Sequence, residues 1–218
     1  MNPLRHEFIQ TCYASQRTPR DSEAPTTYLD IGCGGGIFAE SAARMSYTKS
    51  VTAIDPSPGV LAIAKGHAKR DPALSSKLTY LGTSIEGLSD TSVKNTQFDV
   101  VTLFEVIEHV TDPSSFLDQV VGRVKPGGWL IMSTIARHWM SYMTTKLVAE
   151  DIMRVVPRGT HDWNKYINPV ELKDYFRSQG GFDNQRIMGV VYIPGLGWKK
   201  IGGSESVGNY FFGVQKKT

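Results

Sequence analysis

The stretch that decides the fold is "LDIGCGGGIFAE" (29–40), in which an apolar strand runs into a glycine-rich turn and then into a helix. Glycines at 32, 34 and 36 allow positive φ and a close approach of a ligand to the backbone, while the helix start offers N–H groups without partners. Dinucleotide-binding turns use the spacing G-x-G-x-x-G instead, and their third glycine would fall at Ile37, which is too large for close helix packing. The turn therefore argues against a pyrophosphate.

Two acidic residues complete the pattern around this turn. Asp55 ends a second strand, where an acidic residue accepts hydrogen bonds from ribose hydroxyls. An alternative is that Asp55 caps the helix after Pro56, and both roles are compatible. Asp30 lies two residues before Gly32. Together these features indicate a nucleoside ligand that carries no pyrophosphate.

Strands and helices alternate through most of the chain, which is typical of a parallel sheet with helices on both faces. Residues 98–104 ("FDVVTLF") are apolar at nearly every position, as in a strand buried on both sides. We expect an α/β fold with a seven-stranded, mostly parallel sheet and one antiparallel edge strand. Strands are expected at 27–31, 50–55, 77–81, 98–104, 129–134, 185–193 and 208–217, and helices at 4–12, 36–45, 58–70, 112–124, 140–157 and 169–180.

One domain covering residues 1–218 is the simplest organisation. It divides into an N-terminal helix and connector (1–26), a core (27–135), an insert (137–169) and a C-terminal part with one helix and strands (170–218). The sequence contains neither an internal repeat nor a low-complexity segment.

The composition limits the function classes. The chain has 218 residues, 40% of them hydrophobic, with a net charge of +3, which is too mild an excess for a nucleic-acid-binding protein. Two distant cysteines make a structural disulfide improbable and indicate a reduced, intracellular protein. No apolar run approaches the ~20 residues of a membrane-spanning helix. Any membrane contact is therefore expected to be peripheral.

A second informative stretch is "FEVIEHV" (104–110), directly after the buried strand. On a helix, Glu105, Glu108 and His109 would share one face. They could be metal ligands, or His109 could act as a general base steered by a glutamate, since free histidine has a pKa of ~6.5. A third interpretation is that the glutamates favour the positive end of a short helix.

The motifs "LDIGCGGG", "AIDPS", "FDVVTLFEVIEHV" and "VKPGGWLIMST" resemble those of class I S-adenosylmethionine-dependent methyltransferases, which have a Rossmann-like fold, over residues 27–135. The resemblance implies that Asp30, Gly32 and Gly34 line the methionine end of the cofactor and that Asp55 binds its ribose. By the same resemblance, the adenine is flanked by Ser84, Ile85 and Glu86, and Phe104 lies under the cofactor. Core packing is the alternative role for Ile85 and Phe104.

The flanking stretches "NPLRHEFI", "DIGCGGGIFAESAAR" and "RVVPRGTHDWNKYINPVEL" are similar to those of ubiquinone-biosynthesis O-methyltransferases, and this similarity extends over nearly the whole chain. It implies that Arg5 reaches the cofactor's carboxylate, and that Glu105, Glu108 and His109 are catalytic and bind a divalent metal beside the acceptor. Mg²⁺ is the expected ion and Zn²⁺ the alternative. Members of this family carry further residues ahead of "NPLR", so an incomplete lid and weaker cofactor binding are expected here.

This resemblance also implies the acceptor. The family methylates catechol-type hydroxyls of polyprenylated ubiquinone precursors, namely a polyprenyl dihydroxybenzoate and demethylubiquinol. Such a metal would stabilise the phenolate as a Lewis acid and orient it for in-line attack. Two alternatives are a methyltransferase for another small phenol or carboxylate, and a cofactor-binding scaffold subunit.

Partners and location follow from the same family. We expect a peripheral position on a membrane, which is the matrix side of the mitochondrial inner membrane in a eukaryote and the cytoplasmic face of the inner membrane in a bacterium. Other ubiquinone-biosynthesis proteins are expected partners, and nucleic acid is not. In the insert, residues 143–156 are a candidate membrane contact. His161 is a second candidate base or ligand, and residues 190–200 are a candidate exit for the polyprenyl tail.

Overall fold

The computed structural model describes residues 1–16, 24–137 and 166–218 of the chain. An eight-stranded sheet in the order β3-β2-β1-β4-β5-β8-β6-β7 forms its centre. The strands are β1 (Thr26–Ile31), β2 (Thr48–Ile54), β3 (Leu78–Leu81), β4 (Phe98–Phe104), β5 (Val124–Ile135), β6 (Phe182–Ile193), β7 (Gly197–Lys200) and β8 (Asn209–Lys216). The α-helices are α1 (Asn2–Ala14), α2 (Ile37–Ala43), α3 (Pro58–Ala68), α4 (Pro113–Gly122) and α6 (Pro169–Gln179), and short 3₁₀ helices are η1 (Pro72–Leu74), η2 (Glu86–Asp90), η3 (Ile107–His109) and η6 (Ser204–Ser206).

The predicted α/β class is confirmed, with two corrections at one side of the sheet. Strands β1 to β5 are parallel, and β8 runs antiparallel to both β5 and β6. The predicted antiparallel strand therefore lies between two other strands rather than at the edge. The edge is formed by β7, a strand that we did not predict, which pairs antiparallel with β6.

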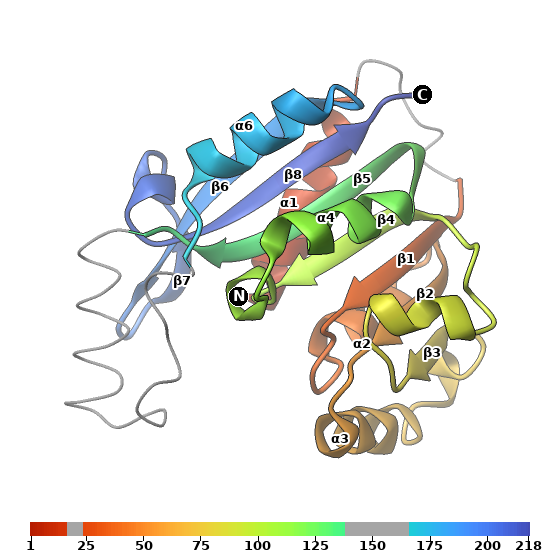
Figure 1. The fold of residues 1–218 in the computed structure, drawn as a ribbon. Helices are drawn as coiled ribbons and strands as arrows, with labels where there is room; N and C mark the ends of the chain where they lie inside the picture. Colours follow the sequence, from red (N-terminus) through yellow and green to blue (C-terminus); the bar gives the residue numbers. More distant parts are fainter. Residues whose placement is uncertain (17–23, 138–165) are drawn as a thin grey trace.

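Helices cover both faces of the sheet. In Figure 1, α4 and α6 lie in front of the sheet and α1 lies behind it. One core cluster joins α4 and α6 to residues such as Val101 and Leu103 of β4, and the other joins α1 and α2 to Val100 and Phe104 of the same strand. The two clusters explain why β4 is apolar on both faces, since it is buried from both sides.

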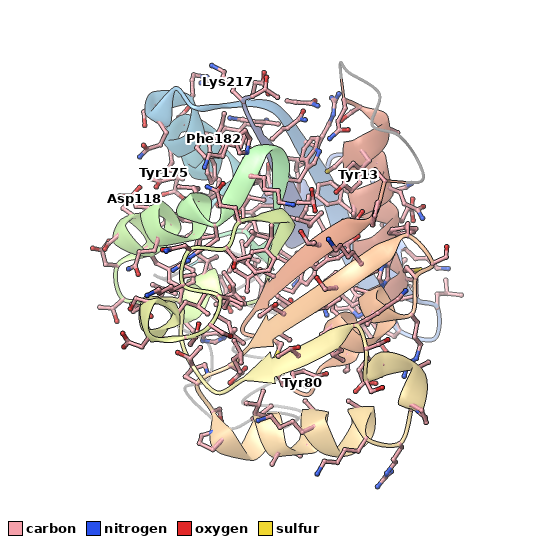
Figure 2. All side chains as sticks on the ribbon, turned by 90° about the vertical axis from the view of Figure 1, so that its right-hand side faces the viewer. Tyr13, Tyr80, Asp118, Tyr175, Phe182 and Lys217 are labelled. Atoms are coloured by element: carbon pink, nitrogen blue, oxygen red, sulfur yellow. The ribbon has the colours of Figure 1, made fainter. Side chains whose placement is uncertain are left out.

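Residues 105–109, which we call the acidic turn, are followed by a helix whose start is set by local signals. Asp112 is the N-cap of α4 and accepts a hydrogen bond from Ser115 N at 3.2 Å, with Pro113 at the first helical position. The hydroxyl of Tyr175 on α6 donates to Asp118 of α4 at 2.6 Å. Figure 2 shows these two side chains next to each other. This contact keeps α6 beside α4 on the same face of the sheet.

The strand order reverses between β1 and β4. The helix after β1, α2, and the helix after β4, α4, pack on opposite faces of the sheet. In open α/β sheets such a switch point creates a crevice beyond the carboxyl ends of the strands, and ligands bind there. The glycine turn follows β1 and the acidic turn follows β4. The topology therefore brings together two stretches that lie about 70 residues apart in the sequence.

Candidate functional site

The glycine turn adopts a backbone that only glycine tolerates at key positions. Gly32 and Gly36 have φ of 67° and 82°. A Cβ added at Gly32 would lie 2.5 Å from a methyl group of Val106, and one added at Gly36 would lie 2.1 Å from the hydroxyl oxygen of Tyr80. Tyr80 lies on β3 (Figure 2), and its hydroxyl is next to Gly36 of this turn. The turn is thus held by close packing as well as by its φ angles.

Asp55 braces the glycine turn through its carboxylate. One oxygen accepts a hydrogen bond from Gly34 N and the other accepts one from Ser57 N, both at 2.9 Å. Helix α3 begins at Pro58 with Ser57 as its N-cap, so the alternative prediction that Asp55 is the cap residue is wrong. A carboxylate has about four acceptor positions, which leaves Asp55 able to accept further hydrogen bonds from a ligand.

A cavity of about 180 Å³ lies over this turn. Five of the predicted cofactor residues line it, namely Arg5, Asp30, Gly32, Gly34 and Phe104. The guanidinium carbon of Arg5 lies 4.5 Å from the centre of the Phe104 ring, a distance at which the cation and the ring attract each other. Phe104 also belongs to the core cluster under α1 and α2, so both of its predicted roles fit the structure.

Two residues that line the cavity each have a buried polar atom without a hydrogen-bond partner among the described residues. These atoms are Nε of Arg5 and Oδ2 of Asp30. Burial raises the pKa of Asp30 to about 7, although a hydrogen bond from Thr102 and the charge of Arg5 act in the opposite direction. Burial also lowers the pKa of Arg5, against the charges of Glu105 and Asp30. Since orphaned buried polar groups are costly, they indicate a polar ligand.

The residues predicted to flank the adenine lie apart from this cavity lining. Ile85 is buried and packs in the core under α4 and α6, which agrees with its alternative role. Ser84 is half-buried and its hydroxyl oxygen accepts a long hydrogen bond of 3.4 Å from Gly87 N. Glu86 is exposed at the start of η2. Their cofactor roles stay predictions.

The acidic turn after β4 is not the helix face that we predicted. Glu105 precedes the helical part with φ of 61°, and η3 is a single 3₁₀ turn. Glu108 is buried, whereas Glu105 and His109 are exposed. The three side chains therefore do not share one face, because the i, i+3, i+4 relation holds only on a continuous α-helix.

Glu108 is nonetheless an unusual carboxyl group. Its Oε2 accepts a hydrogen bond of 3.0 Å from the hydroxyl of Thr134 on β5. The pKa of Glu108 is raised to about 7, chiefly by burial and in smaller part by the charge of Glu105, against the opposing effect of its hydrogen bonds. A buried carboxyl group with such a raised pKa is a candidate functional residue.

Across residues 1–16, 24–137 and 166–218, no group of three or more His, Cys, Asp or Glu side chains is arranged to hold a metal ion. The metal ligand set of Glu105, Glu108 and His109 thus stays a prediction. The candidate membrane segment 143–156 and His161 lie outside the described residues. None of the helices described is long and apolar enough to span a bilayer.

A second cavity, of about 250 Å³, is bordered by Val110 and Thr111, which follow the acidic turn. Its charged residues are Arg137, two residues beyond the end of β5, and Glu171 of α6, which form an ion pair. The sequence reasoning missed Arg137. The signal that could have found it is its place directly after a predicted strand of the parallel sheet, where binding residues concentrate.

The comparisons with known proteins agree on a methyltransferase. The family profile described as "Methyltransferase domain" matches residues 5–186. A Candida albicans protein named "Ubiquinone biosynthesis O-methyltransferase, mitochondrial" is 43% identical over 89% of this chain and 59% of its own length. A protein of the same name from Schizosaccharomyces pombe is 40% identical over 99% of this chain and 77% of its own. The chain thus spans less than two thirds of the Candida protein.

The similarity includes a bacterial protein and solved structures. A Nitrobacter winogradskyi "Ubiquinone biosynthesis O-methyltransferase" is 38% identical over 89% of this chain and 72% of its own. The plantazolicin methyltransferase BpumL in complex with SAH superimposes with a TM-score of 0.68 at 15% identity, over 98% of this chain and 82% of that chain. At this identity the structural match establishes the fold alone.

Proposed function

The chain belongs to the ubiquinone biosynthesis O-methyltransferase family, and on that premise we propose that it methylates a catechol-type hydroxyl of a polyprenylated ubiquinone precursor, with S-adenosylmethionine as the methyl donor. The observation that carries this proposal is the 40% identity to the Schizosaccharomyces pombe protein over 99% of this chain. The arrangement of the glycine turn and the acidic turn at neighbouring strand ends supports it.

The described residues fit the cofactor. Its carboxylate would pair with Arg5, whose Nε is an orphaned donor, and its amino group would face Asp30, whose Oδ2 is an orphaned acceptor. Its ribose hydroxyls would bind Asp55. When bound, S-adenosylmethionine supplies an electrophilic methyl group, which a phenolate oxygen attacks in line. The residues of this chain must orient the acceptor, exclude water and remove the phenol proton.

We place proton removal at the acidic turn. His109 is exposed there, directly after Glu108, and histidine is the side chain that most often acts as a general base. Glu108 is buried and bonded to Thr134, so it serves to position the turn. The carboxylate of Glu105 is exposed beside the cofactor cavity, where its charge acts on Arg5.

The family resemblance also predicts a divalent metal ion at the acidic turn. Two carboxyl groups within electrostatic reach of each other, Glu105 and Glu108, support it. As arranged in the described structure they do not form a three-ligand site together with His109, so we derive no step through a metal. Calorimetric titration with Mg²⁺ and with Zn²⁺, on wild type and on Glu105→Ala, tests the site directly, with methyl transfer in EDTA as a second readout.

The location follows from the relatives. The Candida and Schizosaccharomyces proteins are named mitochondrial, and the Nitrobacter protein is not. We propose a peripheral position at the inner membrane, on the matrix side in a eukaryote or the cytoplasmic side in a bacterium, because a polyprenylated acceptor resides in lipid. Other proteins of the same pathway are proposed partners there.

An acceptor panel tests the function. The protein is titrated with S-adenosylhomocysteine by calorimetry and then assayed with a short-prenyl dihydroxybenzoate, the matching monohydroxybenzoate and an unprenylated phenol. We expect cofactor binding and methylation of the dihydroxy compound only. Binding with methylation of another acceptor would favour a different small-molecule methyltransferase, and absence of cofactor binding would favour a scaffold subunit.

A further inference from the structure

The second cavity is built from three elements that meet beyond the carboxyl end of the sheet. They are the stretch leading into α4, the end of β5, and the stretch that begins α6. The wall is more apolar than polar, and the side chains that carry polar groups are an arginine, a glutamate, a threonine and a tyrosine. The lining residues are Val110, Thr111, Pro113, Arg137, Tyr166, Ile167 and Glu171.

This cavity adjoins the acidic turn. Val110 directly follows His109 in the chain. On the other wall, Arg137 comes three residues after Thr134, whose hydroxyl is bonded to Glu108. Phe104, just before the turn, lines the cofactor cavity instead. Both cavities therefore border the stretch 104–111, and a molecule in the second cavity would lie beside the acidic turn.

Arg137 is held in place at its backbone and at its tip. Its N–H donates to Oδ1 of Asn168 at 2.9 Å, and its guanidinium pairs with Oε1 of Glu171. The other oxygen of Glu171 accepts the N–H of Asn168 at 2.6 Å, which fixes that carboxylate at the start of α6. The Arg137 side chain stays 31% exposed. A guanidinium has five N–H donors, and the ion pair to one oxygen of Glu171 engages only part of that capacity.

We infer that this cavity binds the ring of a carboxylated aromatic acceptor and that Arg137 recognises the ring carboxylate. The inference rests on the proposed function, and it adds that this chain recognises the carboxylate of the acceptor ring. An arginine beside an apolar wall suits an aromatic acid, because guanidinium and carboxylate form paired, charge-assisted hydrogen bonds while the ring packs on the wall.

The size of the cavity agrees with this assignment. Pockets for drug-sized ligands measure about 300–1,000 Å³, and this one measures about 250 Å³. It has room for a substituted ring rather than for a long polyprenyl chain, whose tail must leave the cavity elsewhere. Arg137 then distinguishes the two expected acceptors, since a dihydroxybenzoate carries a carboxylate and demethylubiquinol does not.

The test compares two acceptors in one enzyme. Arg137→Gln and Arg137→Lys are assayed with a short-prenyl dihydroxybenzoate and with the same catechol lacking the carboxylate. For Arg137→Gln we expect KM to rise about 10- to 100-fold for the carboxylated acceptor, the range given by the loss of a hydrogen bond to a charged group, with kcat nearly unchanged. KM for the decarboxylated acceptor should change less than twofold, and Arg137→Lys should recover part of the loss.

The matched control is Arg177→Gln. Arg177 pairs with Asp174 at 2.8 Å on the same helix that carries Glu171, and it is 73% exposed. Its replacement should change neither acceptor's KM.

The outcomes separate the inference from the function on which it rests. A wild type that methylates both acceptors, with Arg137→Gln impaired on both alike or on neither, overturns the role of Arg137 and leaves the function standing. A wild type that methylates neither acceptor while binding the cofactor overturns the proposed function itself. Retained activity on the decarboxylated acceptor shows that the variant is folded, and a selective loss on the carboxylated one supports the inference.

Discussion

The hydroxyl of Thr134 donates a hydrogen bond to Oε2 of Glu108 across 3.0 Å, and both side chains are buried. This bond links the end of β5 to the turn after β4. It stabilises the ionised form of a carboxyl group whose burial raises its pKa to about 7. It thereby connects the shape of the acidic turn to the protonation of its buried member.

Thr134→Val should raise the pKa of Glu108 above 7, because it removes a hydrogen bond that favours the carboxylate. Infrared titration of the protonated carboxyl band, assigned with Glu108→Gln, measures the midpoint. Thr79→Val, at an exposed site on β3, is the control and should leave the midpoint unchanged. A Thr134→Val midpoint at or below the wild-type value would refute the role of this bond.

The buried carboxyl group of Asp30 should make the free energy of unfolding depend on pH. Its pKa in the folded protein is raised from 3.8 to about 7, chiefly by burial, so the folded state binds this proton more tightly than the unfolded state does. The resulting stabilisation is fully present below pH ~4 and is lost as the pH rises through ~7. The loss amounts to about 4 kcal/mol at most. Denaturant unfolding of Asp30→Asn should lack this component, whereas an identical pH slope in both proteins would contradict the assignment.

The same carboxyl group should make the affinity for the cofactor depend on pH. The amino group of S-adenosylmethionine favours ionised Asp30, so affinity should rise between pH 6 and 8 and binding should release a proton. Calorimetry in two buffers of different ionisation enthalpy measures the release. Asp30→Asn should bind more weakly and show no pH dependence in this window.

Gly36→Ala should destabilise the protein. The residue has φ of 82°, and the new Cβ would meet the Tyr80 hydroxyl oxygen at 2.1 Å. We expect a loss of about 1–3 kcal/mol in unfolding free energy. Gly35→Ala is the matched control, because a Cβ there has nothing within 4 Å. Equal losses in the two variants would show that the packing against Tyr80 is unimportant.

Glu105 combines a left-handed backbone with an exposed carboxylate. Glu105→Gly should leave the unfolding free energy unchanged or raise it by up to about 1 kcal/mol, because strain is relieved while glycine adds freedom to the unfolded chain. Methyl transfer should fall in Glu105→Gly and also in Glu105→Gln, which keeps the strain. Full activity in both variants would remove Glu105 from the site.

Much of the fold could be predicted because its signals are local. The strand Phe98–Phe104 coincides with its apolar run, and Asp112 caps α4 as its sequence position indicates. The strand β7 was missed because its residues, "GWKK", have little strand character of their own. It forms through pairing with β6, with Tyr192 opposite Trp198, and such a partner cannot be read from a short polar stretch.

The cofactor part of the site could be predicted from the sequence, and the acidic turn could not. The glycine turn and its acidic neighbours have a recognisable spacing, and the structure gathers Arg5, Asp30, Gly32 and Gly34 around one cavity. The shape of the acidic turn was not predictable, because the positive φ of Glu105 breaks the helical spacing that its sequence suggests. Arg137 was missed because it contacts Asn168, 31 residues further along the chain.

The most direct test of the central claim is a single-turnover reaction with S-adenosylmethionine labelled in its methyl group. The protein, in excess over a short-prenyl dihydroxybenzoate, is mixed with the labelled cofactor, and the product is analysed by mass spectrometry and NMR. We predict one labelled methyl group on one ring oxygen, with S-adenosylhomocysteine formed in equal amount. Bound cofactor with an unlabelled ring, or label on the carboxylate instead of a hydroxyl, would contradict the account.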